Sequence, residues 1–298
     1  MSSSTMAAQI IDGKEVAKSV RKALKGRIRV LAEQGVQPGL AAVLVGDDPA
    51  SATYVHSKAK ACEKLKLYSR VIVKAADTTQ AELLQIVNDL NADAKIHGIL
   101  VQSPLPSHID ELAITLAISP DKDVDGFHPH NVGLVLLGRP SLLPCTPFGI
   151  VKLLEHYQLD PAGKEVVIVG RSNIVGKPVA AMLLQKGPMA NATVTVAHSR
   201  SVDLPSITRR ADIVIAAVGR PDTITADMIK DQAVVIDVGV NRVDAPDTEK
   251  GYRLVGDVDF EGCAARASWI TPVPGGVGRM TIAMLMVNTV TAAELLSL

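Results

Sequence analysis

The run VVIVGRSNIVGKPVAAMLL, Val166 to Leu184, decides the fold of this 298-residue chain. A β-branched apolar strand ends at Gly170, and an Ala- and Leu-rich segment of helical character follows Gly176. A glycine turn between a buried strand and a helix points several backbone N–H groups at one place, where an anion can bind. Three interpretations stay open at this point: a triphosphate loop, a dinucleotide loop, or an ordinary tight turn.

The spacing of the two glycines disfavours a triphosphate loop. Five residues, Arg171 to Val175, separate them, and Pro178 follows Lys177 where a magnesium-binding hydroxyl is required. The GxGxxG fingerprint also fails, because Ser172 occupies the position of its second glycine. The order of strand, glycine turn and helix still favours a dinucleotide.

The end of the next apolar run indicates which dinucleotide. An NAD site usually has an acidic residue there for the ribose 2′-hydroxyl. ATVTVAHSRS instead offers His198, Ser199 and Arg200, and Arg171 stands on the first turn. Basic and hydroxyl groups suit a 2′-phosphate, so the sequence predicts NADP rather than NAD.

Composition limits the class of protein and its partners. Lys plus Arg and Asp plus Glu both number 31, so the formal net charge of +0 gives no reason to expect nucleic acid or an anionic membrane as partner. The three cysteines form no CxxC pair, which argues against a disulfide framework or structural zinc. We expect no apolar run that spans a bilayer, a frayed N-terminus at MSSSTMAAQ, and a cytoplasmic protein.

The pattern of apolar runs predicts two α/β domains. Buried strands at 40–46, 69–75 and 97–102 alternate with helices at 12–35, from GDDPAS to about Leu67, and at about 77–93, which indicates a parallel sheet. The second half repeats this alternation. We expect one domain over 1–150, completed by the C-terminal helix 280–298, and another over 151–279. We expect the Asp-, Gly- and Pro-rich segment 119–133 to be a long irregular loop, and such loops often carry function.

Four polar residues in the first half are placed where they can converge. Tyr54 and Lys58 are separated by one helical turn and share a face. Gln102 ends a strand and Asp125 lies in DVDGF, and ligands of α/β sheets bind at strand ends and the loops that follow. The alternatives stay open: a solvated lysine, a glutamine that satisfies loop backbone, and an Asx turn. His128 and His130 lack a carboxylate–histidine set at ligand spacing, so we expect no metal site.

The chain resembles the bifunctional methylenetetrahydrofolate dehydrogenase/cyclohydrolase family from about Ile10 to its C-terminus. The resemblance depends on motifs in a fixed order: SATYVHSKAKA, GILVQSPLP, DKDVDGFHPHNVG, PCTPFGI, VGRSNIVGKPVA, VGRP, IDVGVN, GDVDF and TPVPGGVGRMT. It implies an α/β folate-binding catalytic domain, a Rossmann-type NADP-binding domain with a cleft between them, and a homodimer.

The resemblance also implies roles for residues at matching positions. Lys58 resembles the catalytic lysine, Tyr54 the tyrosine that orients folate, Gln102 the residue that tunes the lysine, and Asp125 the anchor of the pterin ring. Further matches are folate contacts at Ser51, Pro274, Gly275 and Gly276. Cofactor contacts are implied at Gly170, Arg171, Ser172, Ile174, His198, Ser199, Arg200, Gly219, Val238 and Gly276.

The implied chemistry has two steps. Hydride passes from the one-carbon bridge of 5,10-methylene-tetrahydrofolate to NADP, and water then opens the 5,10-methenyl cation to 10-formyl-tetrahydrofolate. Lys58 is the expected proton carrier. Two alternatives remain: a dehydrogenase that lacks the second activity or prefers NAD, and a non-catalytic nucleotide-binding protein on the same fold.

The chain departs from the family's motifs at two positions. Ser103 stands where the family usually has Leu, beside Gln102, and changes a wall residue of the expected folate site. Arg279 stands where the family usually has Pro, so it removes a rigid turn residue and adds a charge beside Gly275 and Gly276. Both departures bear on substrate fit and cofactor geometry.

Overall fold

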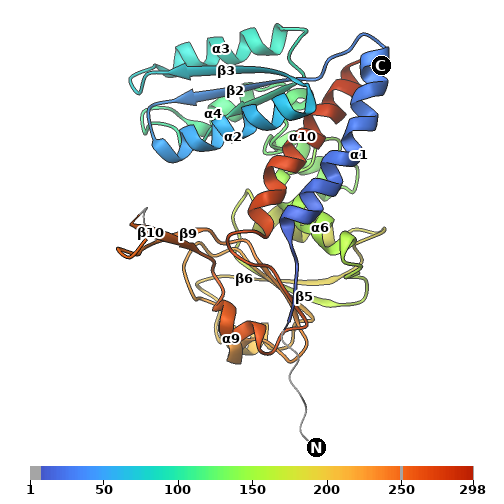
Figure 1. Ribbon diagram of the computed structural model, residues 1–298, viewed down its shortest axis with the longest axis vertical. Coiled ribbons are helices and arrows are strands. Elements are labelled where there is room, and N and C mark those ends of the chain that lie inside the picture. Colours follow the sequence, from blue (N-terminus) through green and yellow to red (C-terminus); the bar gives the residue numbers. More distant parts are fainter. Residues whose placement is uncertain (1–7, 249–250, 298) are drawn as a thin grey trace, which may run out of the picture. The chain divides into compact units, whose positions relative to one another are not determined.

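The computed structural model describes residues 8–248 and 251–297, so most of the expected frayed N-terminus lies outside the described residues. The chain divides into two compact units (Figure 1). Unit 1 consists of the described residues among 1–18 and 146–281, and unit 2 consists of 19–145 and 282–297. The division differs from the expected boundaries mainly at the start of the chain, where residues up to Lys18 cluster with unit 1.

Unit 1 is built on a parallel six-stranded sheet in the order β1-β11-β8-β7-β5-β6. Its central strands are fully buried runs of Val, Ile and Ala, as a parallel sheet covered on both faces requires. The strands are β1 (Gln9–Ile10), β5 (Glu165–Val169), β6 (Thr193–Ala197), β7 (Ile213–Ala216), β8 (Val234–Asp237) and β11 (Trp269–Ile270).

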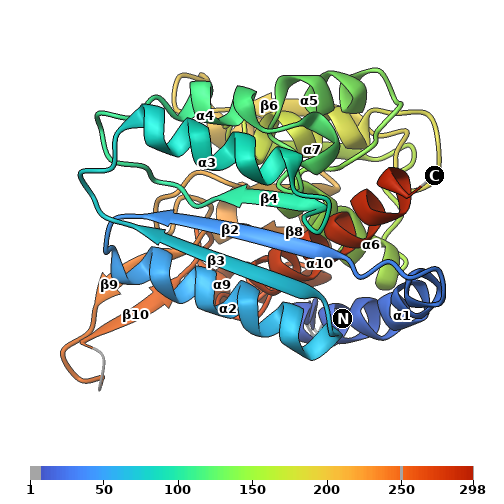
Figure 2. The same cartoon turned by 90° about the horizontal axis from the view of Figure 1, so that it is seen from above.

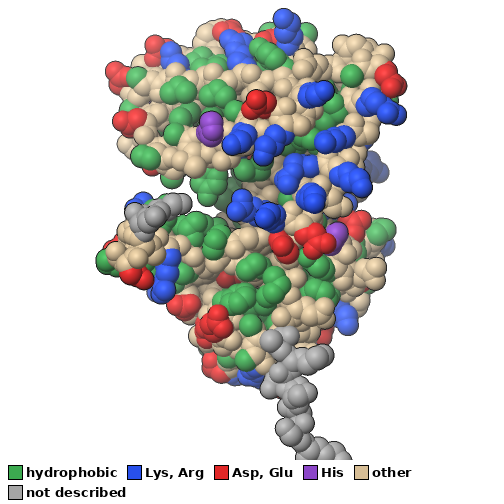
Figure 3. Space-filling view, in the orientation of Figure 1, with side chains coloured by type: hydrophobic (Ala, Val, Ile, Leu, Met, Phe, Trp, Pro, Cys, Tyr) green, Lys and Arg blue, Asp and Glu red, His purple; other side chains and the backbone are tan. Residues whose placement is uncertain are grey.

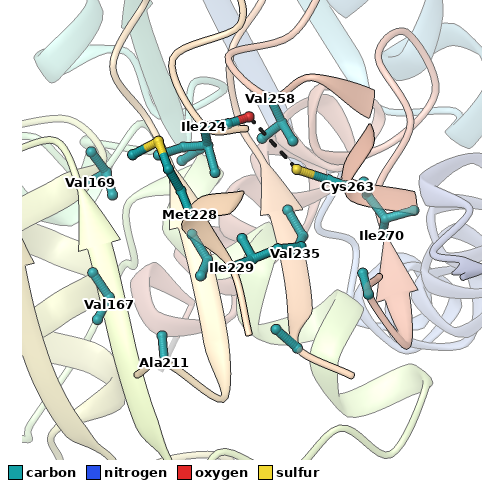
Figure 4. Packing of buried hydrophobic residues seen from close by; sticks show 14 of the residues in the cluster. Val167, Val169, Ala211, Ile224, Met228, Ile229, Val235, Val258, Cys263 and Ile270 are labelled. Carbon is teal, nitrogen blue, oxygen red and sulfur yellow. Dashed lines mark hydrogen bonds between the residues drawn. The ribbon is translucent and has the colours of Figure 1, made fainter. Parts of the chain in front are cut away.

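The helices and the hairpin of unit 1 connect these strands. They are α6 (Cys145–His156), α7 (Gly176–Leu183), α8 (Leu204–Thr208), η2 (Ala226–Met228), α9 (Phe260–Ala264), and the antiparallel pair β9 (Asn241–Asp244) and β10 (Tyr252–Val255). One face of the sheet packs on α9 and η2. Figure 4 shows this core, in which Val235 and Ile270 lie beside Ile224, Val258 and Cys263, all buried.

Unit 2 contains a parallel three-stranded sheet in the order β3-β2-β4. Helices α2 and α3 cover its two faces (Figure 2). The central strand β2 is buried on both sides, and its residues Ala41, Val43 and Val45 pack against α3. The elements are β2 (Gly39–Val45), α2 (Pro49–Leu65), β3 (Tyr68–Lys74), α3 (Gln80–Ala92), β4 (Gly98–Val101), α4 (Glu111–Ala117), η1 (Pro120–Lys122) and α5 (Pro129–Leu136).

Helices α1 (Gly13–Glu33) and α10 (Val277–Leu296) contribute residues to both units. In unit 2 the Arg27 guanidinium joins them: Nε donates to Glu294 Oε1 at 2.9 Å and Nη2 donates to Thr291 Oγ1 at 2.8 Å. The expectation that no run could span a bilayer was wrong by length and composition, since α10 passes that test among the described residues. A core helix passes it too, and 56% of the apolar window of α10 is buried.

The zero formal net charge conceals a local separation of charge on α1. Figure 3 shows Lys and Arg side chains gathered over this helix. The exposed cations recur at three- or four-residue intervals and therefore follow one face of the helix: Lys14, Lys18, Lys22, Lys25 and Arg29. Of these, Arg29 pairs with Glu33 at 3.6 Å, one helical turn away.

The predicted α/β class with parallel sheets is confirmed. The predicted strands of the first half match β2, β3 and β4 to within a residue or two. A capping box begins α3: Thr79 Oγ1 accepts from the Glu82 N–H, and the Glu82 carboxylate accepts from the Thr79 N–H. The expectation of an irregular segment over 119–133 was wrong, because η1 and the start of α5 lie there.

Candidate active site

Helix α2 presents Ser51, Tyr54 and Lys58 in unit 2. Asp48 caps its N-terminus by accepting from the Ser51 N–H at 2.7 Å, and Pro49 occupies the first turn, where its missing N–H is not needed. Ser51 and Lys58 are buried, whereas Tyr54 is 51% exposed. Helix α2 therefore buries the amine of Lys58 in unit 2 and exposes the phenol of Tyr54, one helical turn earlier.

Lys58 and Gln102 are in direct contact. Lys58 Nζ donates to Gln102 Oε1 at 2.9 Å, and Gln102 Nε2 donates to the Ser103 carbonyl at 2.6 Å. The second bond fixes which end of the amide faces the lysine, since only the oxygen can accept from the ammonium. The expected tuning partner of Lys58 is thus brought to it, at the carboxyl end of β4.

Asp125 lies in the loop between η1 and α5, and its carboxyl group is desolvated. Burial raises the pKa of Asp125 to about 6, the positive charge of Lys58 opposes that rise, and Asp123 reinforces it. The electrostatic effect of Lys58 links Asp125 to the Lys58–Gln102 pair. Lys58 and Gln102 are therefore in contact, and the carboxyl group of Asp125, with its raised pKa, lies within electrostatic range of Lys58 in unit 2.

Asp123 organises the loop that carries Asp125. Its carboxylate accepts from the backbone N–H groups of Gly126, Phe127 and His128 and from Asn131 Nδ2. His128 Nδ1 accepts from the His130 N–H at 3.0 Å and so caps α5, which explains one of the two histidines without a metal. No group of His, Cys, Asp and Glu in residues 8–248 and 251–297 is arranged to hold a metal ion.

Asn288 of α10 supports the same loop from within unit 2. Its side-chain Nδ2 donates to the Val124 carbonyl at 2.8 Å and to the Leu143 carbonyl at 2.7 Å. The Cys145 thiol donates to the Val124 carbonyl as well, and burial raises its pKa well above the usual value. Asn288 is buried, and its bond to Val124 is made away from water, whereas its bond to Leu143 is part-buried.

In unit 1, the turn from β5 to α7 has the close packing that a nucleotide loop needs. A Cβ atom on Gly176 would lie 2.7 Å from the carbonyl carbon of Gly170, so a larger residue there would force the turn apart. Gly170 has φ +131°, which L side chains rarely adopt. Ser172 Oγ accepts from the Val175 N–H at 3.1 Å and holds the turn, while Arg171 and Ile174 are exposed.

The residues after β6 lie beside this turn, because β6 pairs with β5 in parallel up to Ala197 opposite Val169. His198 accepts from the Arg200 N–H at its Nδ1, at 3.1 Å, and donates its own N–H to Ser201 Oγ. Ser199 and Arg200 are exposed. Among the described residues, the side chains of Arg171 and Arg200 form no ion pair, which leaves both cations available to a ligand.

The remaining residues expected at the cofactor follow neighbouring strands of the same sheet. Gly219 follows β7, Val238 follows β8, and the Pro274–Gly276 loop follows β11. Parallel strands put their carboxyl ends at one edge, so these positions share the edge of the β5–α7 turn. Gly13 of α1 packs against the Gly276 carbonyl and fits there only because it has no side chain.

Three supporting residues escaped the sequence analysis. Asn288 donates across 164 positions of the chain, which no local pattern reveals. Asp237 and Asp257 are buried and receive several backbone N–H groups each. Asp257 stands in the GDVDF motif, so a signal was present, but its partners come from distant segments.

Two family models match the chain. Residues 11–125 match the tetrahydrofolate dehydrogenase/cyclohydrolase catalytic domain, and residues 144–297 match the tetrahydrofolate dehydrogenase/cyclohydrolase NAD(P)-binding domain. The first range contains Lys58, Gln102 and Asp125, and the second contains the β5–α7 turn.

Individual relatives agree over nearly the whole chain. The bifunctional protein FolD of Moorella thermoacetica is 58% identical over 289 residues, which cover 97% of this chain and 100% of the relative. The crystal structure of the bifunctional FolD enzyme of Campylobacter jejuni has a TM-score of 0.91 and 50% identity, covering 97% of this chain and 99% of that one. The Trypanosoma brucei enzyme, solved with NADP and an inhibitor, has a TM-score of 0.91 and 40% identity, covering 97% and 98%.

Proposed function

Since the chain belongs to the tetrahydrofolate dehydrogenase/cyclohydrolase family, we propose that it converts 5,10-methylene-tetrahydrofolate to 10-formyl-tetrahydrofolate in two steps. The first step is an NADP-dependent oxidation to the 5,10-methenyl cation, and the second is hydrolysis of that cation. The family membership confirms the resemblance that the motifs predict. The Lys58–Gln102 contact is the observation that carries the proposal, because it supplies a positioned proton carrier.

In unit 2 we assign the folate chemistry to four side chains. Lys58 is the general acid and base, and Gln102 holds its amine in one place. Asp125 anchors the pterin ring, because a carboxylate can accept hydrogen bonds from the N–H and amino groups of that ring. Tyr54, exposed one turn before Lys58, stacks on the folate or orients it, and the buried Ser51 contributes a hydroxyl at the start of the same helix.

In unit 1 we assign nucleotide binding to the carboxyl edge of the six-stranded sheet. The close backbone packing at Gly170 and Gly176 holds the turn after β5 in the strand–turn–helix arrangement whose N–H groups bind a phosphate. Arg171, Ser199 and Arg200 are the expected contacts of a 2′-phosphate, and their exposure and freedom from ion pairs fit a dianion. Other assigned contacts are Ser172, Ile174, His198, Gly219, Val238 and the Pro274–Gly276 loop.

The two steps make different demands on these residues. Bound NADP supplies the hydride acceptor. The first step depends mainly on alignment, which the rigid turn residues of unit 1 and the folate contacts of unit 2 provide. The second step needs a proton taken from the attacking water and one given to the departing ring nitrogen. We assign both proton transfers to Lys58, and its hydrogen bond to Gln102 supports this assignment by holding the amine in position.

We also propose a cytoplasmic homodimer that acts on a small folate and has neither nucleic acid nor a membrane as partner. The even balance of charge gives no reason to expect nucleic acid or an anionic membrane as partner. Size-exclusion chromatography with light scattering tests the dimer, since a monomeric mass would contradict it.

One assay tests the function. The protein is given methylene-tetrahydrofolate with NADP or with NAD, and the reduced nucleotide and the methenyl chromophore are followed together. Rapid NADPH formation with only transient methenyl supports the proposal. Methenyl that accumulates and persists would support a dehydrogenase without the second activity, and faster turnover with NAD would contradict the NADP assignment. Binding of NADP without turnover would favour a non-catalytic protein. The departures from the family's motifs at Ser103 and Arg279 are the reason to test this alternative.

A matched pair of variants tests the role of Lys58. Lys58→Ala should lower cyclohydrolase turnover by about 100-fold or more, because it removes the proton carrier. Lys60→Ala is the control, since Lys60 is exposed on the same helix. Full cyclohydrolase activity in Lys58→Ala would show that the assignment is wrong.

A further inference from the structure

The carboxylate of Asp257 collects donors from two loops at the carboxyl edge of the sheet in unit 1. Oδ2 accepts from the Val218 N–H at 2.6 Å and the Gly219 N–H at 2.9 Å. Oδ1 accepts from the Arg220 N–H at 3.0 Å and from Asn241 Nδ2 at 2.9 Å. Three consecutive backbone N–H groups after β7 and one side chain after β8 therefore converge on one carboxylate.

The backbone of Asp257 is held as firmly as its side chain. Its N–H donates to Asp237 Oδ1 at 2.9 Å, and its carbonyl accepts from the N–H groups of Thr223 at 2.7 Å and Ile224 at 3.1 Å. Val258, the next residue, packs in the apolar core beside Ile224 (Figure 4). Asp257 is completely buried, so its carboxylate is a fixed acceptor for the loops that follow β7 and β8.

Asp237 and two glycines complete this arrangement. The Asp237 carboxylate accepts from the Gly239, Asp257 and Val258 N–H groups. A Cβ atom on Gly239 would lie 2.6 Å from the Asp257 nitrogen, and one on Gly256 would overlap the Asp237 carboxylate. Within the described residues, no Lys or Arg pairs with either carboxylate, so their donors are backbone N–H groups and the Asn241 amide.

We propose that Asp257 is a positioning residue for the nucleotide: it holds the Val218–Arg220 turn, and through Asn241 the segment after β8, in the shape that receives the dinucleotide. The inference rests on the proposed function, which assigns cofactor contacts to Gly219 and Val238. Its physical basis is preorganisation. A turn already fixed in its bound shape loses less conformational entropy when the ligand binds, and the affinity is higher for that reason.

Asp257→Asn tests the proposal, because the change keeps the shape of the side chain and removes one acceptor. Either orientation of the new amide turns its NH₂ group toward two donors: Val218 and Gly219, or Arg220 and Asn241. We expect the Kd of NADP and its KM to rise about tenfold or more. Cyclohydrolase turnover of added methenyl-tetrahydrofolate, which uses no nucleotide, should stay within about twofold.

Two further variants keep the test decisive. Asn241→Ala removes one donor to Asp257 and should raise the Kd in the same direction by a smaller factor, even if Asp257→Asn does not fold. Asp259→Asn is the control: it weakens the cap of α9, where Asp259 accepts from the Gly262 N–H, and leaves the Val218–Arg220 turn untouched. Its Kd for NADP should match that of the wild type.

Direct binding, measured by calorimetry, separates failure of this inference from failure of the proposed function. A wild type that binds NADP but turns over no folate would end the proposed activity, and the Kd of each variant would still judge the inference. An unchanged Kd in folded Asp257→Asn would overturn the inference and leave the activity standing. Equal losses of NADP affinity and cyclohydrolase turnover in that variant would also overturn it, since they indicate a general structural role. A wild type that binds no NADP would contradict both proposals.

Discussion

Lys58 Nζ lies 2.9 Å from Gln102 Oε1, and the other end of that amide is bonded to the Ser103 carbonyl. The amine is therefore held by a neutral acceptor whose orientation is fixed from both sides. A neutral partner positions the ammonium without the charge attraction that would oppose release of its proton. We therefore expect the proposed proton transfer by Lys58 to depend on the identity of residue 102 as well as on the lysine.

Gln102→Glu should lower the cyclohydrolase rate at neutral pH by about tenfold and move the pH of its maximum upward. The new carboxylate attracts the ammonium and keeps the proton on it, so fewer molecules have a lysine ready to accept one. A pH–rate profile for hydrolysis of methenyl-tetrahydrofolate measures this. Gln85→Glu, a matched change on α3, should leave the profile unchanged, and an unshifted profile for Gln102→Glu would contradict the idea.

Asp125→Asn should keep or raise the free energy of unfolding at neutral pH and, at the same time, weaken the binding of folate. Burial raises the pKa of Asp125 from 3.8 to about 6, so the folded protein holds this proton more tightly than the unfolded chain does. Ionisation of Asp125 therefore lowers the free energy of unfolding of the wild type as the pH rises from about 4 to about 6. Asparagine cannot ionise, so the variant does not lose this stability. We expect the variant to be at least as stable as the wild type above about pH 6, and the difference to vanish near about pH 4.

Denaturant titrations over this pH range, together with folate kinetics, measure both effects. The KM for folate should rise in Asp125→Asn because the anchor of the pterin ring has lost its charge. A variant less stable than the wild type at neutral pH would show that the carboxylate receives hydrogen bonds that outweigh its burial.

Asn288→Ala should lower the free energy of unfolding by about 2–4 kcal/mol, because it removes a buried side-chain amide, leaves the part-buried Leu143 carbonyl without this donor, and leaves the Val124 carbonyl with the weak thiol donor of Cys145. Thr291→Ala, on the same helix, loses a half-buried bond from Arg27 and should cost no more than about 1 kcal/mol. Chemical denaturation compares the two. Asn288 bonds to the loop that carries Asp125, whereas Thr291 bonds to Arg27. The affinity for folate should therefore fall in Asn288→Ala and not in Thr291→Ala.

Arg171→Gln should raise the KM for NADP by about tenfold and leave the KM for NAD within about twofold, because only NADP carries the phosphate that the guanidinium would meet. Lys177→Gln is the control: its amine already donates to Asn173 Oδ1 at 2.7 Å. Equal rises of both KM values in Arg171→Gln would show that Arg171 contacts some other part of the nucleotide.

The sequence predicts best what depends on neighbours in the chain. Buried apolar runs located β2, β4 and β5 because strands covered on both faces exclude polar residues over several consecutive positions, whereas β3, expected to be buried, is largely exposed. The Thr79–Glu82 capping box was predictable because its two partners are three residues apart. Segment 119–133 was misjudged, since His128 and Pro129 begin a helix through a cap that composition alone does not reveal.

Other features depend on pairs that only the fold brings together. Lys58 and Gln102 are 44 positions apart, and Asn288 and Val124 are 164 apart. Helical spacing suggested Lys58 and the strand end suggested Gln102, but the pairing of the two had to come from family resemblance. The role of Asp257 was hidden for a similar reason, because its donors follow two different strands.

The pairing of β1 with β11 sets a limit on the order in which the protein can be completed. Gln9 of β1 pairs with Trp269 of β11. The first described strand to leave the ribosome therefore cannot pair until one of the last has been synthesised. Unit 2 waits as well, since the Val124 carbonyl finds its Asn288 donor only in the final helix. Such distant pairings are slow to form. A nascent chain therefore holds both units unfinished until synthesis is nearly over, and a truncation of α10 should leave it dependent on chaperones.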